Sequence, residues 1–293
     1  MNNRIAIIGC GVAGMTAAIY LKRAGLDVFI LEKSMPGGQI VDNGHILNYP
    51  GFEEIDGSDL ALKILKQVQD LDINVIYEEV TKIDDVGSYK KVITNKNEYK
   101  VGKIIIATGR KPRKLGVKGE DKYNTKGISY CAVCDGSLYK NKKLLIVGGS
   151  DGAFEAAKYL NKLTDNITIL YRREIKAKKY LQDEVKNKVT IKKGEVLEFS
   201  KEDEKLMVRT SDDTLTVDGV FIYIGQIPNA SFVKDLGILD DFGYVKVDSH
   251  FESDIKGIYA IGDAIKKDFY QIVIAMGEAA ECALQIVRGN SGE

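Results

Sequence analysis

A glycine-rich turn between a buried strand and a helix occurs twice in this chain. In the first copy, the apolar run Ile5–Ile8 leads into a G-x-G-x-x-G motif at residues 9–14 and then into a helix. In the second copy, Leu144–Val147 leads into Gly-Gly-Ser-Asp-Gly-Ala at residues 148–153 and another helix. A unit of this kind turns its helix amides toward the pyrophosphate of a dinucleotide. The repeat therefore predicts two related dinucleotide-binding folds.

The residues that end the second strand differ in charge between the two copies. In the first copy this strand ends at Glu32, whose carboxylate suits a free ribose hydroxyl. In the second copy the strand is followed by Arg172 and Arg173, and guanidinium groups suit a 2′-phosphate. The charges predict FAD at the first site and NADPH at the second. The residues expected to bind them are Gly9, Gly11, Gly14 and Glu32 for FAD, and Gly148, Ser150, Arg172 and Arg173 for NADPH.

Two observations leave it undecided whether the second site binds NADPH. Ser150 replaces the glycine whose missing side chain lets the backbone approach a pyrophosphate, and Glu174 puts a carboxylate beside the arginines. A serine is compatible with a phosphate there only if its backbone angles are unstrained. The alternative is that Arg172 and Arg173 are solvated surface charges.

Each copy continues with a polar turn between two strands and a buried strand that ends in glycine. The tail beyond Gly243 is too short for a third domain and is expected to complete the first. We therefore predict an α/β protein of two Rossmann-like, doubly wound, three-layer domains, the second inserted into the first. The expected boundaries are residues 1–113 and 243–293 for the FAD-binding domain and residues 114–242 for the NAD(P)H-type domain, with crossings at Arg110–Lys114 and Asp240–Gly243.

Composition narrows the functional classes. The chain has 293 residues with 42 basic and 42 acidic side chains, so its zero formal charge does not favour nucleic acid as a partner. Its four cysteines are too few and too scattered for a secreted disulfide scaffold. The uncharged run Ile5–Leu21 imitates a signal peptide, but three glycines interrupt it. No segment is expected to span or bind a membrane, and a cytoplasmic location is expected.

Cys131 and Cys134 are separated by two residues and followed directly by Asp135. A zinc site would need a second pair of ligands at comparable spacing, which the sequence lacks, so no metal is expected. Inert thiols are a further alternative. The favoured interpretation is a redox dithiol with Asp135 as the catalytic acid, because thiol–disulfide exchange delivers a proton to the departing sulfur. As part of an Asp-Gly pair, Asp135 could instead simply form a turn.

With these motifs in place, essentially the whole chain resembles the low-molecular-weight thioredoxin reductases. The resemblance rests on a series of short segments in family order. They are the first glycine turn, Gly37-Gly38-Gln39, Asn48-Tyr49-Pro50-Gly51-Phe52, Ala107-Thr108-Gly109, Cys131-Ala132-Val133-Cys134-Asp135-Gly136, Ile224-Gly225-Gln226-Ile227-Pro228-Asn229, and Gly262-Asp263 with Gln271. A Cys-x-x-Cys-Asp motif just before the second nucleotide motif is specific to this family.

The resemblance implies a flavin-dependent thioredoxin-disulfide reductase, a homodimer with one FAD per subunit, in which the inserted domain rotates between half-reactions. It implies that Cys134 is the sulfur near the flavin, Cys131 the thiol that attacks thioredoxin or a thioredoxin-like protein, and Asp135 the acid. The residues implied to contact FAD are Gly9, Gly11, Gly14, Glu32, Gly38, Gln39, Asn48, Asp263 and Gln271.

The chain departs from the family pattern where NADPH would bind. The first departure is Ser150. The family's basic motif, His-Arg-Arg-x-x-x-Arg, appears here as Tyr171–Lys176, which is one residue shorter and ends in Lys176 instead of arginine. Near the C-terminus, Tyr270 replaces the arginine of the family's Arg-Gln pair. NADPH is favoured because Arg172 and Arg173 remain. The alternatives are a ferredoxin-dependent thioredoxin reductase, a flavin dithiol oxidase, and a non-catalytic flavoprotein that senses redox state.

Overall fold

The computed structural model describes residues 4–42 and 46–291. The chain divides into two compact units, each described here by itself. Unit 1 consists of Met1–Lys111 together with Ile227–Glu293, and unit 2 is Pro112–Gln226. Within the described residues, no helix has the length and apolar character needed to cross a membrane.

A five-stranded parallel sheet in the order β18-β7-β1-β2-β3 forms the centre of unit 1. Its strands are rich in buried Ile and Val and lie in register from Ile5 opposite Val28 and Lys103. Continuous apolar strands of this kind are typical of a parallel sheet covered on both faces. The strands are β1 (Ile5–Ile8), β2 (Val28–Glu32), β3 (Asn74–Tyr77), β7 (Lys103–Ile106) and β18 (Ile258–Ala260).

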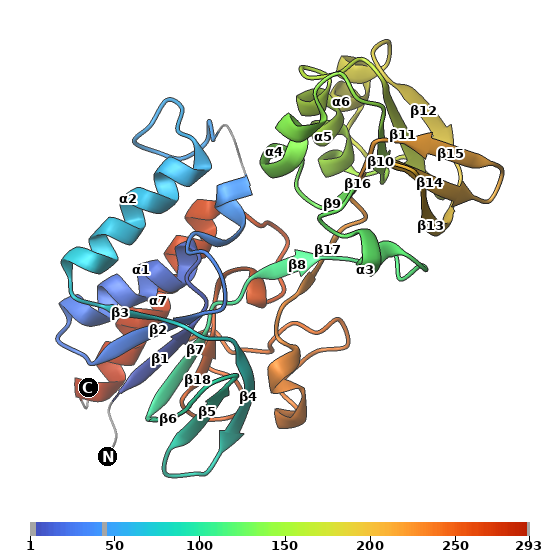
Figure 1. Cartoon of the computed structure of the whole chain (residues 1–293). Coiled ribbons are helices and arrows are strands. Elements are labelled where there is room, and N and C mark those ends of the chain that lie inside the picture. The colour runs from blue at the N-terminus through green and yellow to red at the C-terminus, as the bar shows by residue number, and fades with distance from the viewer. Residues whose placement is uncertain (1–3, 43–45, 292–293) are drawn as a thin grey trace. The chain divides into compact units, whose positions relative to one another are not determined.

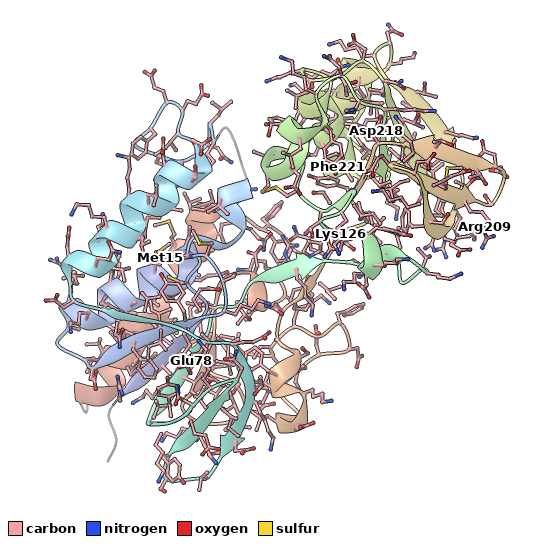
Figure 2. All side chains as sticks on the ribbon, viewed as in Figure 1. Met15, Glu78, Lys126, Arg209, Asp218 and Phe221 are labelled. Carbon is pink, nitrogen blue, oxygen red and sulfur yellow. A yellow bond between two sulfur atoms is a disulfide. The ribbon has the colours of Figure 1, made fainter. Side chains whose placement is uncertain are left out.

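Helices cover one face of this sheet and a three-stranded antiparallel sheet covers the other (Figure 1). On the helical side, Met15 is fully buried (Figure 2). The helices are α1 (Val12–Arg23), α2 (Gly57–Asp70) and α7 (Ile272–Ser291), and the antiparallel strands are β4 (Val80–Asp85), β5 (Lys90–Thr94) and β6 (Glu98–Val101). Short 3-10 turns occur at η1 (Gly38–Asp42), η3 (Ser231–Leu236) and η4 (Gly262–Ala264).

Unit 2 repeats the same plan with a parallel sheet in the order β12-β11-β10-β16-β9 (Figure 1). Phe221 on β16, between β10 and β9, is fully buried (Figure 2) and meets the ring of Tyr139 edge-on at 5.5 Å between centroids. The sheet strands are β9 (Ile128–Ser129), β10 (Leu144–Val147), β11 (Ile167–Tyr171), β12 (Thr190–Lys193) and β16 (Gly219–Ile222). The helices are α3 (Glu120–Tyr123), α4 (Ala132–Asp135), η2 (Gly136–Tyr139), α5 (Asp151–Leu160) and α6 (Lys179–Val185), and the antiparallel strands are β13 (Val196–Glu202), β14 (Lys205–Thr210) and β15 (Thr214–Val217).

The return from unit 2 to unit 1 occurs earlier than the sequence indicated. The two connections are β8 (Arg110–Pro112) and β17 (Gln226–Pro228), which pair as a two-stranded sheet. The expected second crossing at Asp240–Gly243, and with it the boundary at residue 242, is wrong. Ala230 and Val233 already pack in the core of unit 1. The Asp-Asp-Phe-Gly run is a turn in which the Asp240 carboxylate accepts hydrogen bonds from backbone N–H groups.

Glu78 links β3 to the antiparallel sheet of unit 1 (Figure 2) and is only 7% exposed. It accepts hydrogen bonds of 2.6 Å from the Thr94 hydroxyl and from the Asn97 amide. The Thr94 bond, opposed by burial and aided by Asn97, holds the pKa of Glu78 below its ordinary value. This carboxylate therefore stabilises the fold above its ordinary pKa and loses that contribution as the pH falls through its lowered folded-state pKa.

We expect Glu78→Gln to lower the melting temperature by a few degrees at neutral pH and to matter less in acid. The reason is that the wild-type carboxylate becomes neutral there, like the amide. Thermal unfolding of both chains at pH 7 and at about pH 3 checks this. A melting-temperature difference that grows on acidification would contradict it.

Candidate functional site

The first glycine turn is held tightly against the strand ends of unit 1. Gly9 has φ +105°, and a Cβ added there would lie 2.5 Å from the carbonyl oxygen of Ala107. A Cβ at Gly14 would overlap the carbonyl oxygen of Gly9. These two glycines are therefore required by the fold itself.

Gly11 is different, because the protein leaves the space beside it open. Its backbone is extended at φ −79° and ψ −177°, and a Cβ there would have no neighbour closer than the Cα of Gly38 at 3.9 Å. The Gly37 N–H donates to the Cys10 carbonyl at 2.8 Å and holds the Gly37-Gly38 turn beside it. A cradle of backbone that side chains do not fill, at the start of α1, fits a pyrophosphate.

Glu32 lies beside this cradle, as the sequence predicted. Its carboxylate accepts the Cys10 N–H at 2.7 Å and the Ser34 N–H at 2.9 Å. A carboxylate has about four acceptor sites, so Glu32 retains the capacity to accept a ribose hydroxyl. Burial, with a smaller effect of Glu32, raises the pKa of the Cys10 thiol to about 12. Cys10 is therefore a packed, protonated thiol.

A second group of predicted FAD contacts gathers around η4 and the start of α7 in unit 1. Asn48 donates from its amide to the side-chain oxygen of Gln271 at 2.9 Å. Asp263 on η4 accepts from the Arg110 guanidinium at 3.1 and 3.2 Å. Gln39 donates to the Arg110 carbonyl oxygen at 3.4 Å. Gln39 and Asp263 are thus both bonded to Arg110.

Three further residues near this second group, Arg110, Tyr270 and Thr108, did not enter the sequence prediction as contacts. The Arg110 guanidinium stacks on the Tyr270 ring, 3.7 Å from its centroid. Thr108 carries a buried hydroxyl oxygen that has no hydrogen-bond partner among the described residues. An unsatisfied buried hydroxyl at the carboxyl end of a parallel strand is where a ligand is expected. Together with Gly11, Thr108 shows that unit 1 fits a bound FAD.

The second glycine turn adopts the same geometry in unit 2. Gly148 has φ +154°, and a Cβ there would lie 2.2 Å from the Tyr223 carbonyl oxygen. Ser150 has φ −97° and ψ 174°, close to the angles of Gly11, so the serine is unstrained. Its exposed side chain makes no capping bond to α5. Ser150 therefore has the unstrained backbone angles that a phosphate site at this turn requires.

The basic residues predicted for the second site lie after β11. Arg172 donates to the Glu195 carboxylate at 3.0 Å, with both side chains at least half exposed. Arg173 is exposed and has no ion pair or hydrogen bond with the described residues. The Lys176 backbone N–H donates to Gly149 at 2.7 Å, whereas its ammonium pairs with Glu174 at 3.3 Å. Arg173 is therefore available to an anionic ligand, whereas the charges of Arg172 and Lys176 are each partly neutralised by a carboxylate.

Cys131 and Cys134 form a disulfide in unit 2. Cys131 is the N-cap of α4, and its sulfur accepts the Cys134 N–H at 3.0 Å. The Ala132 N–H donates to the Tyr223 hydroxyl at 2.8 Å. Tyr223 also lines the second glycine turn, so the dithiol helix and that turn share a support.

Ser129 connects the disulfide to Asp135, a contact that no sequence motif indicated. Its hydroxyl donates to the Asp135 carboxylate at 2.6 Å and accepts the Cys131 N–H at 3.0 Å. A proton donor and a disulfide held by one hydroxyl can carry out thiol–disulfide exchange. The predicted residues therefore form two groups in unit 1, and one in unit 2 that includes the disulfide.

Comparisons with known proteins identify the family to which the chain belongs. Residues 3–279 match the family model described as pyridine nucleotide-disulphide oxidoreductase. A thioredoxin reductase of Listeria monocytogenes is 40% identical over 285 residues, which cover 94% of this chain and 89% of the relative. The crystal structure of Lactococcus lactis thioredoxin reductase matches at a TM-score of 0.90 with 37% identity, over 99% of this chain and 100% of that one.

A ferredoxin-flavin thioredoxin reductase of Clostridium acetobutylicum is 32% identical and covers 99% of both chains, at a TM-score of 0.56. The predicted α/β fold of two Rossmann-like domains is confirmed by the likeness to these structures. The matches span nearly the whole length of this chain and of its relatives. The chain therefore belongs to the pyridine nucleotide-disulphide oxidoreductase family, among its low-molecular-weight thioredoxin reductases.

Proposed function

We propose that this chain is a flavin-dependent thioredoxin-disulfide reductase, which passes electrons from NADPH through FAD and the Cys131–Cys134 disulfide to thioredoxin. The observation that carries the proposal is the disulfide itself. Cys131 is the N-cap of α4, and the Ser129 hydroxyl is hydrogen-bonded both to the Cys131 N–H and to the Asp135 carboxylate. The relatives named thioredoxin reductase support it.

The proposal assigns FAD to unit 1. When bound, FAD accepts two electrons as hydride from a nicotinamide and passes them on singly or in pairs. Gly11 leaves room for the pyrophosphate, Glu32 accepts a ribose hydroxyl, and Thr108 offers an unsatisfied hydroxyl. The other residues proposed to hold FAD are Gly9, Gly14, Gly38, Gln39, Asn48, Asp263 and Gln271.

NADPH is proposed to bind at the second glycine turn, near the dithiol helix. Gly148 and Ser150 would hold its pyrophosphate against α5, and Arg172 and Arg173 would bind the 2′-phosphate. Lys176 would add a weaker attraction, because Glu174 pairs with it. Arg173, which is exposed and makes no hydrogen bond or ion pair with the described residues, is suited to bind a doubly charged phosphate.

The two sulfurs are proposed to have separate roles. Cys131 accepts the N–H of Cys134, and an amide directed at a sulfur stabilises its thiolate. This supports Cys131 as the thiol that attacks thioredoxin and Cys134 as the sulfur that receives electrons from the flavin. In each full cycle the Cys131–Cys134 dithiol gives two electrons and two protons to one thioredoxin disulfide, and Asp135 carries one of those protons.

The chain is also proposed to form homodimers. Large apolar side chains are exposed on the helical side of unit 1, and their burial would favour self-association. These side chains are Tyr20, Leu62, Val273 and Leu284, each more than 40% exposed. A cytoplasmic location remains an expectation from the sequence.

A ferredoxin-dependent reductase is the second candidate. The exposed serine in the second glycine turn and the pairing of Lys176 with Glu174 both weaken a nicotinamide site. A relative at 32% identity is named as a ferredoxin-flavin enzyme. Reduced ferredoxin would then supply single electrons to the flavin in place of hydride.

The donor is identified by mixing the FAD-loaded chain anaerobically with NADPH. We expect the visible absorbance of FAD to bleach rapidly. We expect Arg173→Ala to weaken NADPH binding by roughly tenfold, the size of one charge-assisted hydrogen bond, and to leave NADH binding unchanged. Arg209→Ala is the control, because this exposed arginine of unit 2 pairs with Glu198 on β13 (Figure 2).

Two outcomes would oppose the NADPH assignment. No bleaching by NADPH over many minutes, with bleaching by reduced ferredoxin, would favour the second candidate. An equal loss of affinity in the Arg173 and Arg209 variants would mean that Arg173 does not bind the 2′-phosphate.

A further inference from the structure

Ser129 is a buried hydroxyl at the centre of the dithiol site. It lies on β9, opposite Phe221 of β16, and is 5% exposed. Its oxygen is 2.6 Å from the Asp135 carboxylate, 3.0 Å from the Cys131 backbone nitrogen and 3.2 Å from the Cys131 carbonyl oxygen. The hydroxyl has a single proton, which it can donate either to the Asp135 carboxylate or to the Cys131 carbonyl oxygen.

The geometry allows two complete hydrogen-bond arrangements. A hydroxyl has one proton and two lone pairs, and the Cys131 N–H occupies one lone pair. When Asp135 is ionised, the Ser129 proton is donated to its carboxylate. When that carboxyl oxygen is protonated, it donates to the second lone pair, and the Ser129 proton turns to the Cys131 carbonyl. No buried polar group is left unsatisfied in either arrangement.

This matters because an acid catalyst must exist in both forms at one position. Attack of the Cys131 thiolate on a substrate disulfide forms a mixed disulfide and expels a thiolate, which takes one proton. The Cys134 thiolate then attacks Cys131, re-forms the enzyme disulfide and expels the second thiolate, which takes another. Both protons come from the enzyme dithiol, and a carboxyl group that delivers one must be reprotonated without moving away.

We propose that Ser129 is a positioning residue that holds the Asp135 carboxyl group beside Cys131 in both of its protonation states. The inference rests on the proposed function and deepens it. An alanine at this position would leave the protonated carboxyl without an acceptor and the Cys131 N–H unsatisfied. Other ionisable groups near Asp135 are the two active-site sulfurs and the Tyr139 hydroxyl. The pKa of Tyr139 is raised mainly by burial and to a smaller extent by the charge of Asp135.

The test uses two small disulfides that differ in their need for a proton. Hydroxyethyl disulfide expels an alkyl thiolate that must be protonated, whereas 5,5′-dithiobis(2-nitrobenzoate) expels an aromatic thiolate that leaves unprotonated. The FAD-loaded chain is reduced with dithiothreitol, desalted anaerobically and mixed with each disulfide in a stopped-flow instrument. Proton delivery affects only the first reaction, whereas a distorted dithiol slows both.

We expect Ser129→Ala to slow the reaction with hydroxyethyl disulfide by at least about tenfold and to change the other by less than about twofold. The near-isosteric pair Ser129→Thr and Ser129→Val controls for packing, because only threonine keeps the hydroxyl. Threonine should resemble the wild type, and valine should resemble alanine. Should alanine fail to fold, this pair still decides the question.

The Asp135→Asn variant separates this inference from the proposed function. We expect it to show the same dependence on the disulfide, and Ser129→Ala should then add no further loss. Equal slowing of both disulfides by Ser129→Ala, or no slowing of either, would overturn the role of Ser129. If Asp135→Asn itself fails to discriminate between the disulfides, the role of Asp135 as the acid fails instead.

Discussion

Replacement of Cys131 by serine is expected to reduce thioredoxin reduction by at least about 10³-fold while leaving FAD bound and reducible by NADPH. A serine hydroxyl is a far weaker nucleophile than a thiolate and cannot form a disulfide. The residues proposed to bind FAD lie in unit 1 and are unchanged by this substitution. Anaerobic bleaching of the flavin and turnover with thioredoxin, measured on the same preparation, check the two halves of the prediction.

Cys134→Ser distinguishes the roles of the two sulfurs. It retains the attacking thiol but not the one that resolves the intermediate, so it should accumulate a mixed disulfide between Cys131 and thioredoxin. Cys131→Ser should accumulate none. The control is Cys282→Ala, which removes a buried thiol of α7 whose pKa burial raises. A mixed disulfide formed by Cys131→Ser alone would exchange the two assignments, and full turnover by that variant would refute them.

The sequence predicts the architecture best where an apolar strand is followed directly by a glycine turn. The predicted strands at Ile5–Ile8 and Leu144–Val147 have the observed bounds, because a buried strand followed by a glycine turn has few alternatives. The return crossing did not follow. Asp240–Gly243 has the composition of a linker but forms a tight turn. The contacts of Ala230 and Val233 with the core of unit 1 carry no local signal.

The candidate site was predictable only where a motif defines it. Gly11 and Glu32 could be predicted from their spacing in the glycine-rich motif and its following strand, and the dithiol from the Cys-x-x-Cys spacing. Ser129 and Thr108 belong to no spacing rule, because their roles arise from strand ends brought together by folding. Backbone angles are also outside the reach of composition. Only the structure shows that Ser150 adopts the same extended conformation as Gly11.

Because Ser150 and Gly11 have equivalent backbone conformations, substitutions at the two glycine turns can be matched. Gly14→Ala should strongly destabilise unit 1, because the new Cβ overlaps the Gly9 carbonyl of the tight turn. Gly11→Ala should leave the stability of the FAD-free chain nearly unchanged, since its Cβ has 3.9 Å of space. Thermal unfolding of both variants without FAD measures this difference.

The reason for a glycine at position 11 should therefore appear only when FAD is added. We expect Gly11→Ala to weaken FAD binding by about 10- to 100-fold, the cost of a methyl group forced into a filled site. Ser150→Gly should do the reverse and tighten NADPH binding, at little cost to α5, because the serine makes no capping bond. Fluorescence titration of the FAD-free chain and NADPH titration of the loaded chain measure both effects. Unchanged FAD affinity in Gly11→Ala would mean that the space beside this glycine does not receive the pyrophosphate, and the assignment of FAD to this turn would fail.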